Sequence, residues 1–241
     1  MSTLGFRRLA WNAVECAFVA SVLMLGTPIH AASSAASEAV CDIRADYALG
    51  VEDYPEAIRL HENLLRQDPN DALAHYHLGY AYGMNHDAAG ELREYRRAEQ
   101  LGLLQWDLFL NLGILFLENQ NTSAAIDALR MAAKVGPRHP EAHFNLALAY
   151  ERAGLLQTAQ KEILASLALE PDQPDAQNTL AVIYAEMGDD ESARAVWAKL
   201  VRNDPDYQPA RRNLDVLERA TTNGRPELRL SMIADSSLSP R

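Results

Sequence analysis

The sequence predicts an all-α fold in which paired helices stack on one another, and three observations lead to it. Prolines recur at Pro69, Pro137, Pro171 and Pro205, with spacings of 68, 34 and 34 residues. A 34-residue frame that starts at Glu38 then holds five units. Within each unit, a short turn separates two segments with apolar stripes. One helix pair cannot bury its own apolar face, so we expect stacked pairs to share a continuous core.

The same places of this frame carry the same kinds of side chain. The eighth place is small in every unit and holds Ala45, Gly79, Gly113, Ala147 and Ala181. In the last four units leucine stands one place earlier and an aromatic side chain stands three places later. Residues four apart share one face of a helix. The leucine and the ring therefore mark a buried stripe, and the small residue between them lets a neighbouring helix approach closely.

The segments that carry this pattern are similar to a known repeat. FLNLGILF, HFNLALAY and QNTLAVIY stand in the first halves of units, and AIDALRMAAKVGP, AQKEILASLALEP and ARAVWAKLVRNDP stand in the second halves. They resemble the tetratricopeptide repeat family, from Glu38 to about Ala220. The resemblance implies a right-handed superhelical solenoid of five helix-turn-helix repeats. Their expected ranges are 38–71, 72–105, 106–139, 140–173 and 174–207.

Two units depart from the family pattern. Cys41 and Arg44 replace the expected Trp and Leu in the first unit, and Glu91 and Leu103 replace a small residue and a proline in the second. We therefore expect a weakly formed first helix and a slightly distorted second unit.

The N-terminal segment has the features of a secretory signal. Arg7 and Arg8 precede the apolar run CAFVASVLMLG, and the small-residue segment TPIHAASSAAS follows it. We expect a signal peptide over 1–31, cleaved after Ala31, then a linker over 32–37 and a periplasmic location. The alternative is an inner-membrane anchor over 9–26, although Asn12 and Glu15 interrupt that span.

The C-terminal segment after the repeats predicts a cap and a tail. Residues 208–220 begin like another first helix, with Leu214 in the leucine place, but no second half follows. Such a helix with a polar outer face closes an open stack. Residues 221–241 show no clear period, and we expect them to form a disordered tail.

Composition and motifs narrow the class of function. The 241 residues are 48% apolar and 23% charged, with a net charge of −11, which disfavours nucleic acid and anionic lipid as partners. The sequence contains no GxSxG, GxxxxGK[ST], HExxH or GxGxxG motif. We therefore predict a non-enzymatic protein without a cofactor or a small-molecule substrate. A metal-binding or catalytic accessory protein is the alternative from another class.

The histidines are the candidate metal ligands that the sequence offers. His75 and His77 are two apart and should face different directions, and Pro140 separates His139 from His143 at a helix start. The segment HENLL at His61 lacks the second histidine of a zinc helix. These patterns predict no metal site. Cys41, alone in the mature chain, is either a buried thiol or a site of intermolecular pairing.

The resemblance also implies where a partner would bind. In the family, the first helices of the repeats line a concave groove that usually binds peptide segments. The corresponding positions here are Tyr76, Tyr80, Met84, Leu110, Ile114, Leu117, Phe144, Leu148, Asn178 and Val182.

Most of these side chains are apolar or aromatic, so the carboxylate clamp of one family branch, built from Lys, Arg and Asn, is not expected. We predict a protein or peptide partner with an apolar or amphipathic segment, or self-association. The alternative is that neighbouring helices or the tail simply pack these positions. The function predicted is a scaffold or adaptor in the cell envelope, as in assembly of a pilus, a secretion system or another complex. A membrane-anchored subunit remains the second reading.

Overall fold

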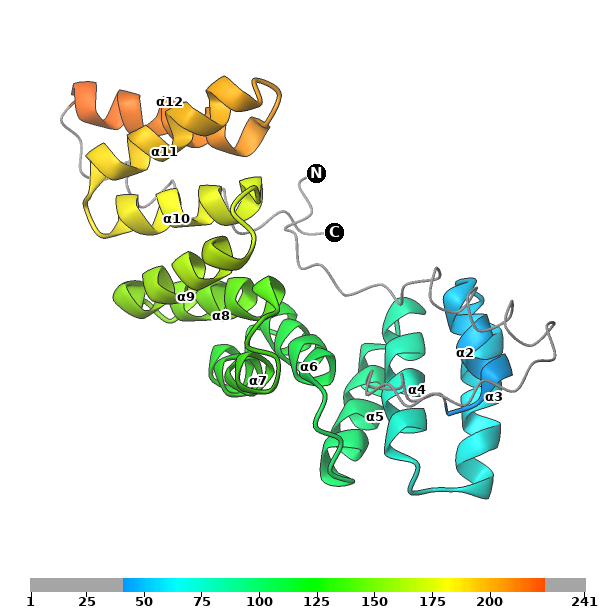
Figure 1. The fold of residues 1–241 in the computed structure, drawn as a ribbon. Helices are drawn as coiled ribbons and strands as arrows, with labels where there is room; N and C mark the ends of the chain where they lie inside the picture. Colours follow the sequence, from blue (N-terminus) through cyan, green and yellow to red (C-terminus); the bar gives the residue numbers. More distant parts are fainter. Residues whose placement is uncertain (1–40, 224–241) are drawn as a thin grey trace, which may run out of the picture. The chain divides into compact units, whose positions relative to one another are not determined.

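The computed structural model describes residues 41–223, and this part of the chain consists of α-helices without a strand (Figure 1). The helices are α2 (Ile43–Gly50), α3 (Tyr54–Gln67), α4 (Ala72–Met84), α5 (Ala88–Gln100), α6 (Trp106–Glu118), α7 (Thr122–Val135), α8 (Pro140–Arg152), α9 (Leu156–Leu169), α10 (Pro174–Glu186), α11 (Asp190–Asn203) and α12 (Gln208–Asn223). Consecutive helices form helix-turn-helix pairs, which confirms the predicted all-α repeat solenoid.

The described residues divide into two compact units, and the division falls between Leu108 and Phe109, inside α6. We call residues 41–108 the N-terminal unit and residues 109–223 the C-terminal unit. The predicted signal peptide, the linker and the alternative anchor over 9–26 lie outside the described residues, as does the predicted tail from 224 onwards. Between 41 and 223, no helix has the length and apolar character that crossing a membrane requires.

The 34-residue period appears directly in the helix starts. The first helices from α4 onwards begin at Ala72, Trp106, Pro140, Pro174 and Gln208, each 34 residues after the last. The second helices begin at Tyr54, Ala88, Thr122, Leu156 and Asp190, again 34 apart. The first unit departs as expected, because α2 has 8 residues where α4 has 13.

Short polar side chains begin many of these helices. Asp42, Asp53, Asp71, Asp87 and Asp189 each stand at an N-cap and accept a hydrogen bond from a backbone N–H of the following turn. An N-cap carboxylate satisfies amides that have no partner inside the helix and is favoured by the helix dipole. These aspartates therefore account for part of the chain's acidic excess through helix formation.

A repeated contact fixes four of the turns that lead into a first helix. A polar side chain contacts the carbonyl oxygen of the closing proline six residues earlier in four places: His75 Nε2 to Pro69 at 3.2 Å, His143 Nε2 to Pro137 at 3.3 Å, Gln177 Nε2 to Pro171 at 2.7 Å and Arg211 Nη1 to Pro205 at 3.3 Å. In the remaining turn, between α5 and α6, Leu103 stands in the place of the proline and Phe109 in the place of the polar side chain. That turn instead uses Gly102, whose φ of 87° is accessible to glycine without steric cost.

The close approach of paired helices depends on the small residue in the eighth place. A Cβ at Gly113 would lie 2.3 Å from Cγ of Leu129 on α7, and a Cβ at Gly79 would lie 2.5 Å from Cδ1 of Tyr95 on α5. Ala147 and Ala181 occupy the same place in later pairs and are fully buried. The large side chain of the second helix thus packs directly over the small residue of the first.

The C-terminal helix packs on the last helix pair of the C-terminal unit. α12 packs against α10 and α11, and its Ala210 and Leu217 are buried in one cluster with Trp197. Asn178 accepts hydrogen bonds from Trp197 Nε1 at 2.9 Å and from Asn213 Nδ2 at 3.1 Å, which ties α10, α11 and α12 together. The helix continues to Asn223, three residues beyond the predicted end of the cap at 220.

Two carboxyl groups in the C-terminal unit interact directly. Glu151 on α8 and Glu186 on α10 are both half-buried, and their side chains hydrogen-bond. Burial and the neighbouring Glu151 raise the pKa of Glu186 to about 8, and burial also raises the pKa of Glu151. Two carboxylates in one place cannot both ionise without repulsion, so one of them retains a proton.

We expect Gly113→Ala to lower the free energy of unfolding by about 1–3 kcal/mol, as overpacking does. The cost arises because the new methyl group overlaps Leu129. Urea denaturation measures it, and exposed Lys134→Ala on α7 is the control, with an expected change within about 0.5 kcal/mol. The cost should disappear in a Leu129→Ala background. An equal loss in both backgrounds would show that this contact is not the cause.

We expect the Glu151–Glu186 pair to make stability pH-dependent. The folded chain holds the proton of Glu186 up to about pH 8, while the ordinary pKa is 4.5. The folded state therefore binds more protons in this window, and stability falls as pH rises through it. Glu186→Gln should raise the melting temperature at about pH 9 more than at about pH 5. Exposed Glu191→Gln is the control, and equal pH dependence in all three proteins would contradict the assignment.

Candidate functional site

The structure divides the predicted groove positions into two groups by their exposure. Tyr76, Tyr80, Leu110, Ile114, Leu117 and Val182 are buried. Met84, Phe144, Leu148 and Asn178 are half-buried. Only the second group presents part of its side chain at a surface of the described structure, so the alternative of packed positions describes the first group better.

Tyr76 illustrates the buried group. Its ring centroid lies 5.7 Å from that of Tyr95 and 5.6 Å from that of His77, inside the N-terminal unit. Burial, followed by the nearby Asp107, raises the pKa of Tyr76 well above its ordinary value. Tyr76 therefore contributes to the core of its unit.

Phe144, one of the half-buried positions on α8, lines a pocket in the C-terminal unit. The pocket is lined by Glu141, Phe144, Asn145, Glu170, Asp172, Gln173, Pro174 and Asp175. Four of these residues are carboxylates and one is an aromatic ring. Asp175 Oδ1 also accepts a hydrogen bond from the Tyr207 hydroxyl at 2.7 Å. This lining suits a cationic group that has an apolar neighbour, since carboxylates attract the charge and Phe144 offers apolar contact.

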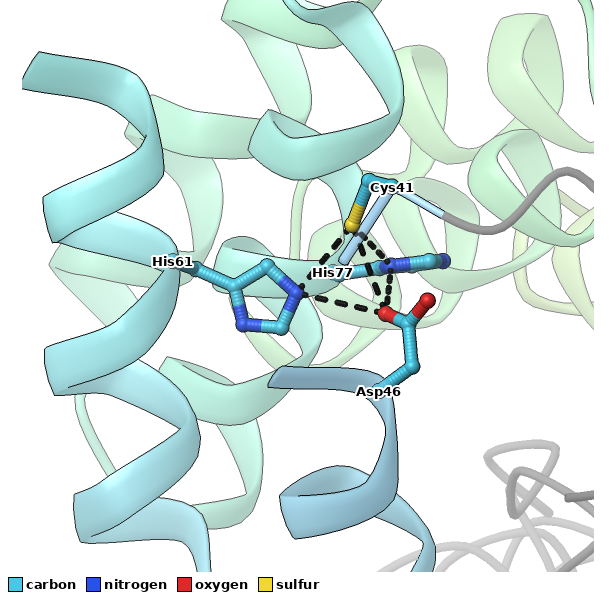
Figure 2. Close-up of side chains that lie close together, drawn as sticks. All are labelled: Cys41, Asp46, His61 and His77. Carbon is cyan, nitrogen blue, oxygen red and sulfur yellow. Dashed lines mark hydrogen bonds and ion pairs between the residues drawn. The ribbon is translucent and has the colours of Figure 1, made fainter. Parts of the chain in front are cut away.

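A second group of chemically active side chains gathers in the N-terminal unit. Cys41 precedes α2, Asp46 lies on α2, His61 on α3 and His77 on α4 (Figure 2). One ligand atom from each residue lies within 4.8 Å of all the others. Asp46, His61 and His77 are buried, while Cys41 is half-buried. The four side chains come from three successive helices and the residue just before them.

The atoms of this cluster lie at contact distance. Cys41 Sγ is 3.1 Å from His77 Nδ1, 3.3 Å from Asp46 Oδ1 and 3.5 Å from His61 Nε2. Asp46 Oδ1 is 2.8 Å from His77 Nδ1 and 3.5 Å from His61 Nε2. The four atoms therefore enclose a small volume with a sulfur, an oxygen and two nitrogens around it.

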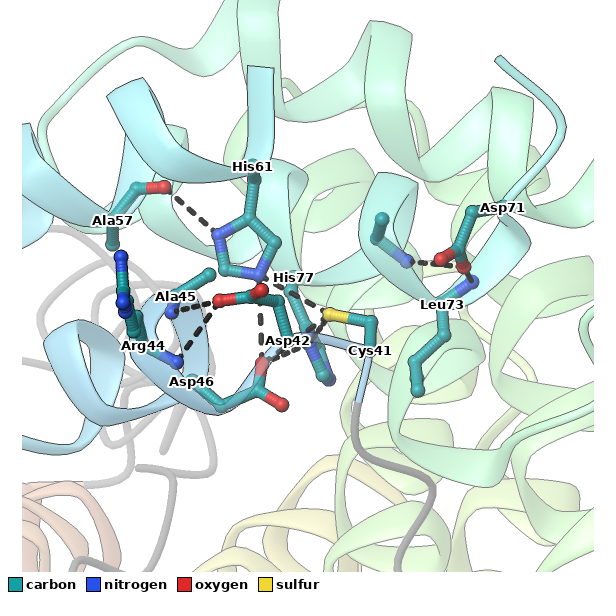
Figure 3. A network of polar contacts seen from close by, with 11 residues as sticks. Cys41, Asp42, Arg44, Ala45, Asp46, Ala57, His61, Asp71, Leu73 and His77 are labelled. Atoms are coloured by element: carbon teal, nitrogen blue, oxygen red, sulfur yellow. Dashed lines mark hydrogen bonds and ion pairs between the residues drawn. The ribbon is translucent and has the colours of Figure 1, made fainter. Parts of the chain in front are cut away.

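Neighbouring groups orient this cluster (Figure 3). His61 Nδ1 lies 2.8 Å from the carbonyl oxygen of Ala57, an acceptor, so that nitrogen carries the proton. In neutral His61, Nε2 then carries a lone pair and faces the cluster. Asp42 caps α2 by accepting from the amides of Arg44 at 2.9 Å and Ala45 at 3.0 Å. This cap starts the helix one turn before Asp46 and directly after Cys41.

The charges of the cluster do not favour a free thiolate. Burial and the adjacent Asp46 raise the pKa of Cys41 well above its ordinary value. Burial alone would raise the pKa of the Asp46 carboxyl, but polar contacts within the cluster lower it below the ordinary range. Burial lowers the pKa of His77. At neutral pH the cysteine is thus a thiol beside a carboxylate, whereas an activated nucleophile needs an electropositive environment.

The other histidine pairs weighed in the sequence do not come together. His75 Nδ1 contacts Glu94 Oε2 at 2.7 Å, away from the cluster that holds His77. His143 Nδ1 contacts Glu162 Oε2 at 2.8 Å. His139 is the N-cap of α8 and makes no capping hydrogen bond through its side chain. The expectations that His75 and His77 face different ways, and that His139 lies outside the helix, are therefore met.

Comparison of the sequence with itself contained a signal for the missed cluster. His61 stands in the place where the other units carry Tyr95, Leu129, Ile163 and Trp197, all fully buried or nearly so. Asp46 stands in the place of Tyr80, Ile114, Leu148 and Val182. Two polar side chains at apolar places of neighbouring helices indicate a polar site in the core.

The helix pairs, their 34-residue period and the small residue at each crossing define a helical-repeat solenoid. Tetratricopeptide repeat models match residues 44–102, 110–166 and 175–207, more than half of the chain. The chain belongs to the tetratricopeptide repeat family. This membership supports a role in protein–protein interaction.

Solved structures share the fold at low sequence identity. The crystal structure of YrrB, a TPR protein with an unusual peptide-binding site, has 23% identity and a TM-score of 0.65, and covers 69% of this chain and 86% of its own. MamA from Desulfovibrio magneticus RS-1 has 18% identity and a TM-score of 0.63, with 68% and 93% covered. The APC/C heterotetramer Cut9–Hcn1 has 15% identity and a TM-score of 0.56, with 80% and 38% covered. No curated protein matches this sequence.

Proposed function

We propose that this chain is a non-catalytic interaction scaffold that binds a peptide segment of a partner protein in the cell envelope. The observation that carries the proposal is the surface around α8 in a member of the tetratricopeptide repeat family. There the half-buried Phe144 lines a pocket rich in carboxylates, and the half-buried Leu148 lies four residues further along the same helix. YrrB, which has the same fold, is described as having a peptide-binding site.

The proposed segment is amphipathic, with a basic side chain next to an apolar one. The apolar part would contact Phe144 and Leu148, as the sequence analysis expects. The basic part would enter the pocket between α8 and the start of α10, where Glu141, Asp172 and Asp175 supply negative charge. A net charge of −11 over the chain would also favour encounter with a basic segment. Met84, in the N-terminal unit, is a further half-buried apolar position at which a partner could bind.

Export is the second part of the proposal. Its support is the order of charged, apolar and small residues over 1–31. The retained anchor over 9–26 is the competing reading. In that location the scaffold would serve as an adaptor in the assembly of a pilus, a secretion system or another envelope complex.

Substitutions of two leucines on α8 distinguish an effect on peptide binding from an effect on folding. Leu148 is half-buried, whereas Leu146 is 2% exposed. Leu148→Ala should weaken peptide binding roughly 10-fold with little loss of stability, because it removes apolar contact at the surface. Leu146→Ala should cost about 2–5 kcal/mol of stability.

The binding experiment selects peptides from a random displayed library on the purified chain and measures affinity by fluorescence anisotropy. We expect enrichment of segments that pair Lys or Arg with an apolar residue. Asp172→Asn should lower the affinity for these segments and make that affinity less dependent on salt concentration, because it removes a negative charge from the pocket. Enrichment of acidic segments, or equal affinity of wild type and Leu148→Ala, would contradict the proposed surface.

The mass of the mature protein tests export. Cleavage after Ala31 predicts a chain that begins at Ala32 when the full gene is expressed in a Gram-negative host and the periplasm is extracted. A full-length chain that stays with the inner membrane would establish the anchor over 9–26 instead.

A further inference from the structure

We propose that Cys41, Asp46, His61 and His77 form a binding site for a divalent transition-metal ion of the zinc class, coordinated tetrahedrally. The site lies within the N-terminal unit and is independent of the peptide surface on α8. It uses one sulfur, one oxygen and two nitrogens.

The distances between the ligand atoms match those of a tetrahedral zinc site. Metal–ligand bonds of about 2.0–2.3 Å place tetrahedral ligands about 3.3–3.5 Å apart. Five of the six separations are 2.8, 3.1, 3.3, 3.5 and 3.5 Å. The sixth, between the two histidine nitrogens, is below 4.8 Å. The side chains are thus arranged around a common centre, and small shifts complete the coordination.

The donor set suits zinc in both type and charge. Thiolate, imidazole and carboxylate are all ligands of Zn²⁺ in proteins. A thiolate from Cys41 and the carboxylate of Asp46 together carry two negative charges, which neutralise a divalent cation. A neutral site is the form that burial favours, because a net charge in the interior is costly. Cys41, which is half-buried, gives the ion a route from the surface.

A network of hydrogen bonds alone accounts less well for the cluster. When His61 donates from Nδ1 to Ala57, its Nε2 lone pair faces Asp46 Oδ1 at 3.5 Å. Two acceptors then face each other inside the protein. The second oxygen of the same carboxylate, Asp46 Oδ2, is buried without a hydrogen-bond partner. A cation at the centre relieves both defects, and the His61–Ala57 contact is the outer-shell hydrogen bond that fixes a ligating histidine.

Metal binding changes the protonation of two of the four ligands. Cys41 releases its thiol proton and forms the metal–sulfur bond. His77 loses its Nδ1 proton and takes one up at Nε2, and His61 binds through the Nε2 lone pair that it already presents. One proton per ion is therefore released to solvent, and no electron is transferred.

The ion would cross-link α2, α3 and α4, which already pack on one another. α2 has only 8 residues, and isolated helices of this length are unstable in water. The ligands come from the start of α2, from α3 and from α4, so one ion cross-links the first helix pair to the second. Binding free energy then becomes folding free energy for this unit.

The test measures metal binding by the full chain. The protein is stripped with chelator, reloaded with Zn²⁺ or Co²⁺ and dialysed, and its metal content is measured by elemental analysis. We expect one ion per chain. The Co²⁺ form should show intense visible d–d bands of a tetrahedral ion and a near-ultraviolet thiolate-to-cobalt charge-transfer band. Zn²⁺ should raise the melting temperature, because the ligand binds the folded state.

Variants separate the cluster from other ligands in the chain. Cys41→Ser and Asp46→Asn keep the shape of the side chain, and each should weaken Zn²⁺ binding by more than about 100-fold, beyond the effect of outer-shell changes. Cys41→Ser should also remove the charge-transfer band. His75→Gln is the matched control, since His75 is on α4 but contacts Glu94 outside the cluster. It should leave affinity unchanged.

Several results would overturn the site. They are substoichiometric metal in a chain that is folded by circular dichroism, an octahedral cobalt spectrum without thiolate charge transfer, or wild-type affinity in Cys41→Ser. Cys41 found in an intermolecular disulfide in the exported protein would also overturn it. Because Leu148→Ala does not touch the cluster, loss of peptide binding and loss of metal binding are separate readouts.

Discussion

The close approach of the two helices in each pair is the constraint on which the rest of the fold depends. The second helix brings a large side chain over the small residue in the middle of the first, as Leu129 does over Gly113. A Cβ at Gly79 or Gly113 would overlap the large side chain of the second helix, and the other units hold alanine, so this place is small along the whole repeat region. The 34-residue period follows, because in each pair the small residue of the first helix must lie opposite the large residue of the second. The N-caps and proline turns then fix where each helix begins.

The N-terminal unit satisfies the same constraint with different chemistry. Tyr95 covers Gly79 in the usual way, but His61 takes the large-residue place in the first pair. His61 is fully buried and packs edge-on against His77, with ring centroids 5.5 Å apart. Polar side chains in a core lower stability unless they have partners. The first pair thus exchanges apolar packing for a set of convergent donor atoms, while the C-terminal unit keeps an apolar core around Trp197 and Ile183.

Sequence periodicity was sufficient for the fold because every unit repeats the same physical solution. The helix pairs could be predicted from places that recur in phase, and the short α2 from the places where the first unit departs from that pattern. The exposure of the groove positions could not be predicted in this way, since Ile114 and Leu148 occupy the same place of the 34-residue frame but only Leu148 is half-exposed. The spacing of residues along one helix also could not predict the cluster, because its four ligands come from separate helices and from the segment before α2. The signal in the sequence was a polar residue at a place where the other repeats carry an apolar one. It is seen by aligning the repeats with one another, and not by inspecting adjacent residues.

The contact between a closing proline and the side chain six residues later has a consequence for how this chain tolerates changes in length. Four turns join a carbonyl oxygen to His75, His143, Gln177 or Arg211, so one inserted residue between the partners would separate them. The turn between α5 and α6 lacks this pair and relies on the backbone freedom of Gly102. An insertion there sacrifices no such bond. For protein engineering, the α5–α6 turn is therefore the natural place to graft a tag, a loop or an additional repeat.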